Sequence, residues 1–247
     1  MVRFINRSFN GFLVTGLGVL LNSLALANPV YNPVTDFSIV NNPNGAWSLG
    51  TENTLGGAFT AFSNAAPNCT APPSGYQTWW GVGGTCITGP FVGKNATGST
   101  FTLTGGGGGL VQPTDQLNLA PGVGIFTVVR WTAPATDTYA INGFFNGIDF
   151  KPTTSDAHVF INGVDSFDAT IAEFNSPHFF SFQRSLLINT TIDFIVGSGQ
   201  DGSSNNDSTG FAGTIASVPE PGAAVLFVFG CGGLLALRKR KGSRTAV

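Results

Sequence analysis

Short runs of apolar and β-branched residues, separated by glycine and asparagine, restrict this chain to a β-rich fold. The clearest case is Ala157–Ile161, then Asn162-Gly163, then Val164–Phe167. Asn-Gly between two apolar runs favours the type I′ turn of a two-residue β-hairpin. Between residues 28 and 217 no segment has a helical periodicity of any length, and lysine and glutamate are scarce. The pattern therefore predicts an antiparallel all-β domain.

About ten short strands are expected along this domain. Ile125–Ala133 carries apolar residues on both faces, which predicts a central strand. His178–Ile188 and Thr190–Val196 are expected to pair across Asn189. Strands of this number with regular turns are typical of an antiparallel β-sandwich of the jelly-roll type. The other expected strands are Thr35–Val40, Trp47–Gly50, Gly57–Ser63, Gln77–Val82, Ser99–Thr104, Thr138–Phe145 and Thr209–Ala216.

The first 27 residues have the composition of a secretory signal peptide. Arg3 and Arg7 precede an apolar core, Gly11–Leu26, which ends in the small-x-small sequence Ala25-Leu26-Ala27. Cleavage there would leave Asn28 as the mature start. The alternative is that this apolar helix stays in the membrane and the chain crosses it twice.

The last part of the chain has three consecutive features. Val218-Pro219-Glu220-Pro221 is followed by the uncharged segment Gly222–Leu237 and by Arg238-Lys239-Arg240-Lys241. A 16-residue helix spans about 24 Å, short of the roughly 30 Å hydrocarbon core, and snorkelling cations or local thinning of the bilayer would cover the difference. The basic cluster prefers the cytoplasmic side of the inner membrane, which places everything upstream outside it.

This tail resembles the PEP-CTERM sorting signal of exosortase-bearing Gram-negative bacteria. Cys231 within the apolar segment and the extension Gly242–Val247 depart from the pattern. The resemblance implies recognition by an exosortase, removal of the tail near Pro219–Pro221, and a host that makes exopolysaccharide. The alternative is a plain C-terminal membrane anchor.

The chain is accordingly divided into a signal peptide (1–27), an exported β-sandwich (28–217) and a sorting signal (218–241). Five motifs of the body are similar to the bodies of many PEP-CTERM proteins: Asp36–Ser38, Asn42–Trp47, Val129–Pro134, Asp193–Gly197 and Asn206–Gly210. That similarity implies a shared jelly-roll-like domain of unassigned function.

Charge and cysteine content support export of the body. Its four basic residues stand against twelve acidic ones, a net charge of −8, whereas the whole chain has −2 because the other bases lie in the two ends. A body of this sign should not bind nucleic acid. Cys69 and Cys86 are expected to form a disulfide in an oxidising compartment, the alternative being two separate thiols.

Enzyme signatures are absent from the sequence, and we predict no catalytic activity. His158 and His178 lie in no metal-binding spacing, and no G-x-S-x-G elbow is present. Gly93-Lys94 lacks the remaining residues of a phosphate-binding loop and is expected to lie in an ordinary loop. Because carboxylate pairs form in space rather than in sequence, the scattered acidic residues leave a glycosidase-type pair open.

One acidic loop has oxygen-bearing side chains at alternate positions: Asp201, Ser203, Asn205 and Asp207. Hard cations such as Ca²⁺ take oxygen ligands at such spacing. Asn206 and Ala212 replace the glycine and glutamate expected of a calcium loop, so a solvated, turn-rich loop is the alternative.

Aromatic residues supply the candidate sugar-binding site. Trp79 and Trp80 must point to opposite faces of one strand, so one of them, with Tyr76, could stack on a sugar ring at the disulfide loop. Trp47 and Trp131 are expected in the core. We therefore predict a non-enzymatic cell-surface or exopolysaccharide-matrix protein, with a carbohydrate-binding jelly-roll module as the alternative. Its expected partners are signal peptidase, exosortase, the inner membrane before processing and, for the alternative, polysaccharide.

Overall fold

A computed structural model describes residues 28–69, 74–104, 109–151 and 154–219, and every regular element in these ranges is a β-strand. The predicted signal helix, the residues from Glu220 to Pro221, the C-terminal helix and the basic cluster lie outside the described residues. Among the residues that are described, none forms a helix long and apolar enough to cross a membrane. The strands are β1 (Val30–Tyr31), β2 (Trp47–Glu52), β3 (Thr60–Ala61), β4 (Asn64–Ala66), β5 (Tyr76–Trp80), β6 (Phe91–Asn95), β7 (Phe101–Leu103), β8 (Leu110–Gln112), β9 (Leu117–Ala120), β10 (Phe126–Thr132), β11 (Asp137–Gly147), β12 (Ser155–Ile161), β13 (Val164–Ile171), β14 (His178–Leu186), β15 (Thr191–Gly197) and β16 (Thr209–Ser217).

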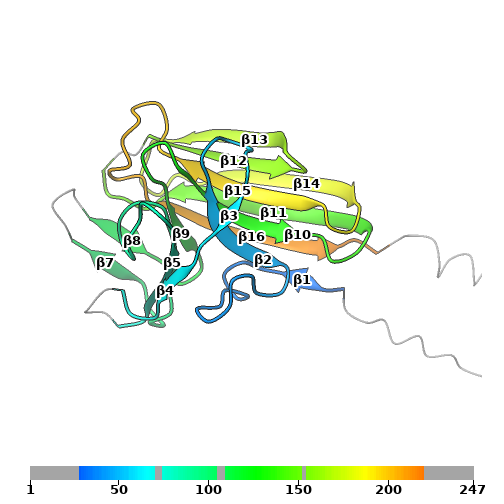
Figure 1. Cartoon of the computed structure of the whole chain (residues 1–247), viewed down its shortest axis with the longest axis horizontal. Coiled ribbons are helices and arrows are strands. Elements are labelled where there is room, and N and C mark those ends of the chain that lie inside the picture. The colour runs from blue at the N-terminus through cyan, green and yellow to red at the C-terminus, as the bar shows by residue number, and fades with distance from the viewer. Residues whose placement is uncertain (1–27, 70–73, 105–108, 152–153, 220–247) are drawn as a thin grey trace, which may run out of the picture.

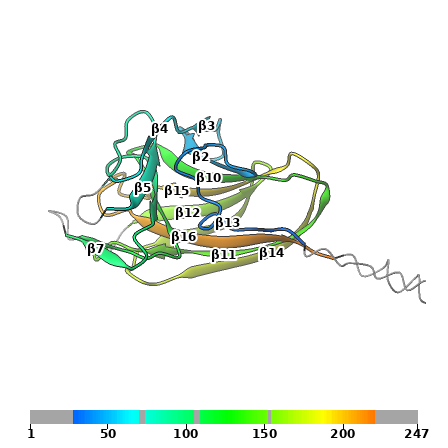
Figure 2. The ribbon, with the colours of Figure 1, turned by 90° about the horizontal axis from the view of Figure 1, so that it is seen from below.

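Two antiparallel sheets pack face to face (Figures 1 and 2). The larger sheet has the strand order β14-β11-β16-β9-β6-β5-β4, with β1 also paired to β16, and the smaller has the order β13-β12-β15-β10-β2-β3. Strands β7 and β8 form a separate hairpin. The predicted all-β antiparallel sandwich is therefore confirmed.

The core lies between the two sheets and is rich in aromatic rings. Trp131 on β10 packs edge-on against Tyr139 on β11, with ring centroids 4.9 Å apart. Phe194 on β15 stacks on Phe211 on β16 at 4.6 Å. Neighbouring Val128 and Val129 are both fully buried although they point to opposite faces of the sheet. The prediction that β10 is a central strand, with Trp47 and Trp131 in the core, is confirmed.

The Asn-Gly hairpin joins β12 to β13 as the sequence predicts. Asn162 and Gly163 both have positive φ, 52° and 77°, as a type I′ turn requires. The register of the pair shifts between Val159 and Phe160, which marks a β-bulge two residues before the turn.

The expected hairpin across Asn189 is wrong. Strand β14 pairs with β11 in the larger sheet, whereas β15 pairs with β10 and β12 in the smaller one. The connection therefore crosses from one layer to the other, and the Asn189 N–H donates to the carbonyl of Ala133 instead of closing a two-strand turn. Both strands bury apolar residues in the same core, so their local patterns look like those of a hairpin.

Three further local predictions need correction. Thr35–Val40 is a loop rather than a strand, because Asn32 Oδ1 accepts the Val34 and Thr35 N–H groups and turns the chain. Only Thr60–Ala61 of the expected strand Gly57–Ser63 is extended in a sheet. The Gly93-Lys94 segment lies within strand β6 rather than in a loop, because it pairs with β5 and β9 on either side.

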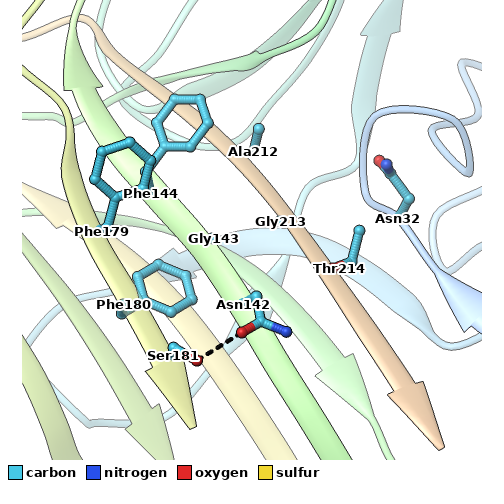
Figure 3. Close-up of a pocket in the computed structure, with 10 residues that line it drawn as sticks. All are labelled: Asn32, Asn142, Gly143, Phe144, Phe179, Phe180, Ser181, Ala212, Gly213 and Thr214. Carbon is cyan, nitrogen blue, oxygen red and sulfur yellow. Dashed lines mark hydrogen bonds between the residues drawn. The ribbon is translucent and has the colours of Figure 1, made fainter.

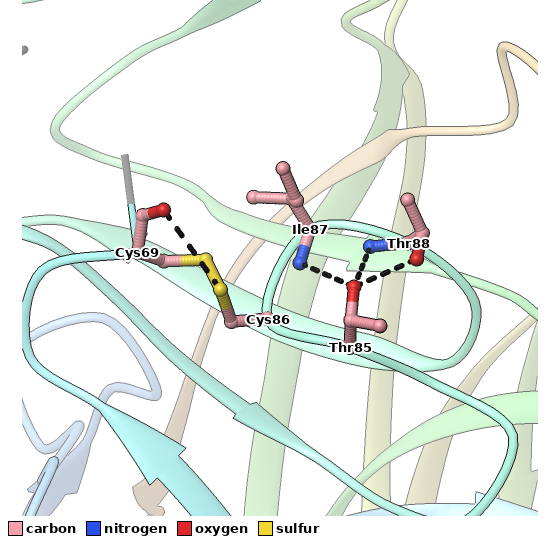
Figure 4. The surroundings of a disulfide bond; sticks show 5 residues. All are labelled: Cys69, Thr85, Cys86, Ile87 and Thr88. Atoms are coloured by element: carbon pink, nitrogen blue, oxygen red, sulfur yellow. Dashed lines mark hydrogen bonds between the residues drawn. A yellow bond between two sulfur atoms is a disulfide. The ribbon is translucent and has the colours of Figure 1, made fainter. Parts of the chain in front are cut away.

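The disulfide between Cys69 and Cys86 is present, with an S–S distance of 2.00 Å (Figure 4). It joins the segment before β5 to the turn that precedes β6. The Cys69 N–H also donates to the carbonyl of Tyr76, at 2.9 Å. The predicted bond is therefore confirmed.

The first and last described segments lie side by side. Strand β1 pairs with the end of β16, and Asn28 Nδ2 donates to the carbonyl of Ser217 at 2.9 Å. The Val218 N–H then donates to the carbonyl of Thr138 at 2.8 Å. This end of the sandwich is opposite the β7–β8 hairpin (Figure 1).

Candidate functional site

The outer face of the larger sheet presents a patch of aromatic, amide and hydroxyl side chains. Because side chains alternate along a strand, residues paired across neighbouring strands share a face. Phe144 on β11 pairs with Phe179 on β14 and with Ala212 on β16. Asn142 pairs with Ser181 and Thr214 in the same way, one step along the strands. These side chains point away from the core, whereas Ile141 and Phe145, which flank them on β11, are buried in it.

A shallow open groove of about 550 Å³ runs over this patch. Phe144 and Ala212 lie at one end and Asn32 and Thr214 at the other (Figure 3). The floor is low because the residues beneath it are small. Gly143 is required there, since a Cβ would lie 2.6 Å from the ring of Phe180 below.

The groove has an apolar wall made by two phenylalanines. The rings of Phe144 and Phe179 are 5.5 Å apart and inclined at 57°. Phe179 is 71% exposed, so its ring face is open to a partner. An exposed aromatic face beside polar groups offers both apolar contact and orientation to a ligand.

Polar groups of the groove are oriented by neighbouring side chains. Ser181 Oγ donates to Asn142 Oδ1 at 2.7 Å, which turns the amide nitrogen of Asn142 toward β16 (Figure 3). The side-chain oxygen of Asn32 is occupied by its own turn. Of the ten described residues that line the groove, none carries a charge. The described lining can supply hydrogen bonds and an apolar face, and it holds no carboxylate, imidazole or amine.

The structure buries two of the three aromatic residues predicted to bind sugar at the disulfide loop. Tyr76 is 1% exposed and Trp79 is 8% exposed, so neither ring can stack on a ligand. Trp79 Nε1 donates to the carbonyl of Ser38, while Tyr76 lies beneath Phe101 of the β7–β8 hairpin. Trp79 and Trp80 do point to opposite faces, but Trp80 packs against Tyr76 and Phe91 and is only half-exposed. The sequence could not show that the β7–β8 hairpin covers this face.

Side-chain oxygens of the acidic loop accept hydrogen bonds from backbone N–H groups of the same loop. Asp201 Oδ1 accepts the Ser203 N–H and Ser203 Oγ accepts the Asn205 N–H. Asp207, two residues before β16, is buried, while Asp201 and Asn205 are exposed. In the described ranges no three His, Cys, Asp or Glu side chains are grouped to hold a metal ion. The calcium site remains an untested prediction from sequence.

One pair of carboxylates does meet in space, on the outer face of the smaller sheet. Arg130 on β10 donates to both oxygens of Asp193, at 2.5 and 2.8 Å, and lies 3.4 Å from Glu52. Its guanidinium also stacks on Phe59, 4.3 Å from the ring centroid. Burial, and then the charge of Asp193, raise the pKa of Glu52 to about 7 against the opposing effect of Arg130. Because both carboxylates are covered and bound to one guanidinium, this cluster is structural rather than a hydrolytic pair facing a cleft.

The two histidines occupy strand positions, as expected. His158 is nearly buried between Asp156 and Asp165, with Nε2 3.1 Å and Nδ1 3.3 Å from the two carboxylates. Burial lowers the pKa of His158, but the hydrogen bond and charge of Asp156, with those of Asp165, outweigh it and raise the pKa above its ordinary value. His178 is the first residue of β14 and directly precedes the groove residue Phe179.

The groove residues themselves were missed by sequence analysis. Phe179 and Phe144 lie in segments recognised as strands, but only the β11–β14 register brings them together. The alternation of Phe179 and Ser181 along the segment that forms β14 is the sequence signal that could have indicated this face.

Comparisons with known proteins assign no family. No protein-family model and no curated protein matches the chain. Among solved structures, the CBM51 module from Clostridium perfringens GH95, in complex with methyl-galactose, aligns at 14% identity over 64% of this chain and 95% of its own, with a TM-score of 0.38. The tandem CBM51 modules of Sp3GH98 from Streptococcus pneumoniae align at 12% identity over 71% of this chain and 50% of their own, with a TM-score of 0.36. The N-terminal cellulose-binding domain of Cellulomonas fimi β-1,4-glucanase C aligns at 16% identity over 49% of this chain and 90% of its own, with a TM-score of 0.28. Likeness at this level does not place the chain in any of these families.

Proposed function

We propose that the groove of Phe144, Phe179, Asn142, Ser181 and Thr214 binds a glycan, and that the protein is a non-enzymatic carbohydrate-binding protein of the cell surface. The observation that carries this proposal is the 71% exposed ring of Phe179 beside the oriented amide of Asn142. A sugar ring has an apolar C–H face and a rim of hydroxyls. It therefore matches a surface that offers an aromatic face and amide or hydroxyl groups side by side.

The shape of the groove favours a polymer over a small metabolite. Small-molecule sites are concave and enclose most of their ligand. This groove is shallow and open, with the Phe144–Phe179 pair at one end and Thr214 at the other. An extended chain can lie along such a surface with its flanking residues in solvent.

Delivery to the surface remains a proposal from the sequence. The secretion signal and the sorting tail are expected to carry the body across the inner membrane and to pass it to an exosortase. The Cys69–Cys86 disulfide is compatible with an oxidising compartment. Strand β16 runs directly into Val218 and Pro219, so a tail that begins there would leave the body beside β1.

A structural matrix role is the second candidate. It is supported by burial of two of the three aromatic residues at the disulfide loop, Tyr76 and Trp79, which leaves only the half-exposed Trp80 there. In this role the sandwich, stabilised by its internal disulfide, would be a structural unit of the matrix without a specific ligand.

Binding to soluble polysaccharides separates the two candidates. We would measure retardation of the full-length protein in native gels that contain hydroxyethyl cellulose, dextran or galactan, for wild type and Phe179→Ala. Loss of the ring should weaken binding about tenfold, equivalent to about 1.4 kcal/mol. Leu187→Ala is the matched control, because Leu187 is also an exposed apolar residue (69%) but lies outside the groove. Equal retardation of Phe179→Ala and wild type, or no retardation by any polymer, would favour the matrix role.

A further inference from the structure

Strand β14 is an edge strand of the larger sheet, and it is long and regular. All nine of its residues, His178–Leu186, pair with β11 without a shift of register. In the described part of the chain no strand lies on its other side. A free edge of this length presents a row of N–H and carbonyl groups with which another strand can pair.

The strands at the other ends of the two sheets have features that prevent such pairing. Strands β3 and β4 have only two and three residues. Strand β13 is longer, but it bears Asp165 and Asp168 and has a bulge at Ser166. Short length, charges and bulges are the usual means of protecting a sheet edge. Strand β14 has no bulge, and its only lysine, arginine, aspartate or glutamate is Arg184.

Every second residue of β14 directs its backbone groups to the free edge. In an antiparallel sheet, successive residues of a strand bond to the neighbour on one side and then to the other side. The Val218 N–H donates to the carbonyl of Thr138, so the even-numbered residues of β11 bond to β16 and the odd-numbered ones to β14. Tyr139 therefore bonds to its partner Arg184, and the even-numbered residues of β14 follow the same pattern. The residues whose backbone groups point to the free edge are Phe179, Ser181, Gln183 and Ser185.

These four residues are spaced so that β14 of a second copy can pair with all of them. In antiparallel pairing about a two-fold axis at Phe182, Phe179 lies across from Ser185 of the second copy, and Ser181 across from Gln183. The two residues of each such pair exchange both of their hydrogen bonds, so none of the four is left unpaired. A shift by two residues would place Ser185 opposite Pro177, which has no N–H. The strand is therefore self-complementary in one register.

The side chains of β14 are compatible with this register. Phe182 would meet Phe182 of the second copy at the axis, and aromatic cross-strand pairs are favourable. Arg184 would lie across from Phe180, four residues from the other Arg184. That separation is about 13 Å, more than the Debye length of about 8 Å at physiological salt. The Arg184 guanidinium donates to the carbonyl of Gln183 at 3.0 Å, but a carbonyl oxygen accepts two hydrogen bonds and this one can still accept another.

We propose that β14 pairs with β14 of a second copy of this chain, and that the larger sheets of the two copies form one continuous antiparallel sheet. The groove residues Phe179 and Ser181 lie on this strand, so the two grooves would open on one face, on either side of the axis. The inference goes beyond the proposed function, because the pairing uses backbone groups and does not depend on what the groove binds.

Sedimentation velocity of the protein purified from its host, over a range of concentrations, tests the dimer. Wild type should show a monomer–dimer equilibrium. Gln183→Pro removes an N–H that points to the free edge, and proline is tolerated at such an edge position because the ladder to β11 does not use that group. By symmetry two intermolecular hydrogen bonds are lost, so the dimer dissociation constant should rise at least about tenfold. Gln183→Ala is the matched control, because it removes the same exposed side chain but keeps the N–H.

Disulfide cross-linking tests the register and does not require a proline in the strand. At the axis the two copies of residue 182 form a non-hydrogen-bonded pair with Cα atoms about 4.5 Å apart, within the range of a disulfide. Phe182→Cys should therefore give a covalent dimer after mild oxidation, seen on a non-reducing gel. Gln183→Cys is the control, since the two copies of residue 183 are two positions out of register. Wild type sets the background, because Cys231 is its one cysteine outside the Cys69–Cys86 bond.

Three results would overturn the inference. If wild type is monomeric at every concentration, the edge is free or is paired with another protein. If Gln183→Pro dimerises as tightly as wild type, the copies associate through another surface. If Gln183→Cys cross-links and Phe182→Cys does not, the assigned register is wrong. Retardation of wild type and Phe179→Ala by polysaccharides reports separately on the groove, so the proposed function can stand or fail independently of the dimer.

Discussion

Replacing Glu52 by glutamine should remove a large part of the pH dependence of folding. Glu52 is 1% exposed and shares Arg130 with Asp193 on the outer face of the smaller sheet. Burial and the charge of Asp193 raise its pKa from 4.5 to about 7. The folded protein therefore binds a proton at this site that the unfolded chain releases between about pH 4.5 and pH 7. Stability from this group is present at low pH and is lost as the pH rises through that window.

The size of the effect follows from the pKa difference. A difference of about 2.5 pH units at about 1.36 kcal/mol each lowers the free energy of unfolding by about 3 kcal/mol across the window. The glutamine in Glu52→Gln cannot titrate. The unfolding free energy of this variant, relative to that of wild type, should therefore rise by about 3 kcal/mol between pH 4.5 and pH 7.5. Asp149, whose pKa burial raises to about 6, and His158, whose pKa is also raised, act in the same direction in both proteins and cancel from the comparison.

Urea denaturation followed by tryptophan fluorescence at four pH values would measure this difference. Glu173→Gln is the matched control, because Glu173 is an exposed glutamate on the loop after β13. A constant difference in unfolding free energy between wild type and Glu52→Gln over the whole range would refute the reasoning. It would mean that Arg130 holds Glu52 ionised in the folded protein despite burial.

Two further predictions concern the disulfide and the tail. Replacing Cys69 and Cys86 together by alanine opens a loop with a sequence separation of 17 and should lower the free energy of unfolding by about 3 kcal/mol, measured by the urea midpoint; an unchanged midpoint would contradict this. Intact mass of the protein should be measured from host strains with and without exosortase. We expect loss of residues 1–27 and of the segment after about Pro219 only in the strain with exosortase. If both strains retain the tail, the C-terminus is a plain membrane anchor.

Much of the fold was accessible from sequence because it depends on local chemistry. Asn162-Gly163 specifies its own turn, since both residues tolerate positive φ. Ile125–Ala133 is apolar on both faces, which only a central strand can bury. Cys69 and Cys86 are the two cysteines between residues 28 and 217, so their pairing needed only proximity.

The wrong predictions concern segments whose local sequence is compatible with more than one pairing partner. The Asn189 connection resembles a hairpin, yet β14 and β15 belong to different layers. The loop prediction for Gly93-Lys94 fails because a glycine weakens the local strand pattern, although Gly93 makes room for the Tyr76 hydroxyl within β6. Burial of Tyr76 and Trp79 likewise depends on the β7–β8 hairpin and the N-terminal loop, which lie far from them in sequence.

The sequence by itself determined the all-β class, the hairpin at Asn162-Gly163, the disulfide pair and the acidic body, because composition and nearest-neighbour conformation specify them. Only the tertiary structure decided which aromatic residues face solvent and which residues of distant strands lie side by side on one face of the sheet. Cross-strand register places residues as distant in sequence as Thr78 and Asn146 on one row, and a shift of one residue would turn every one of them to the opposite face. The groove at Phe179 is therefore a property of the assembled sheet.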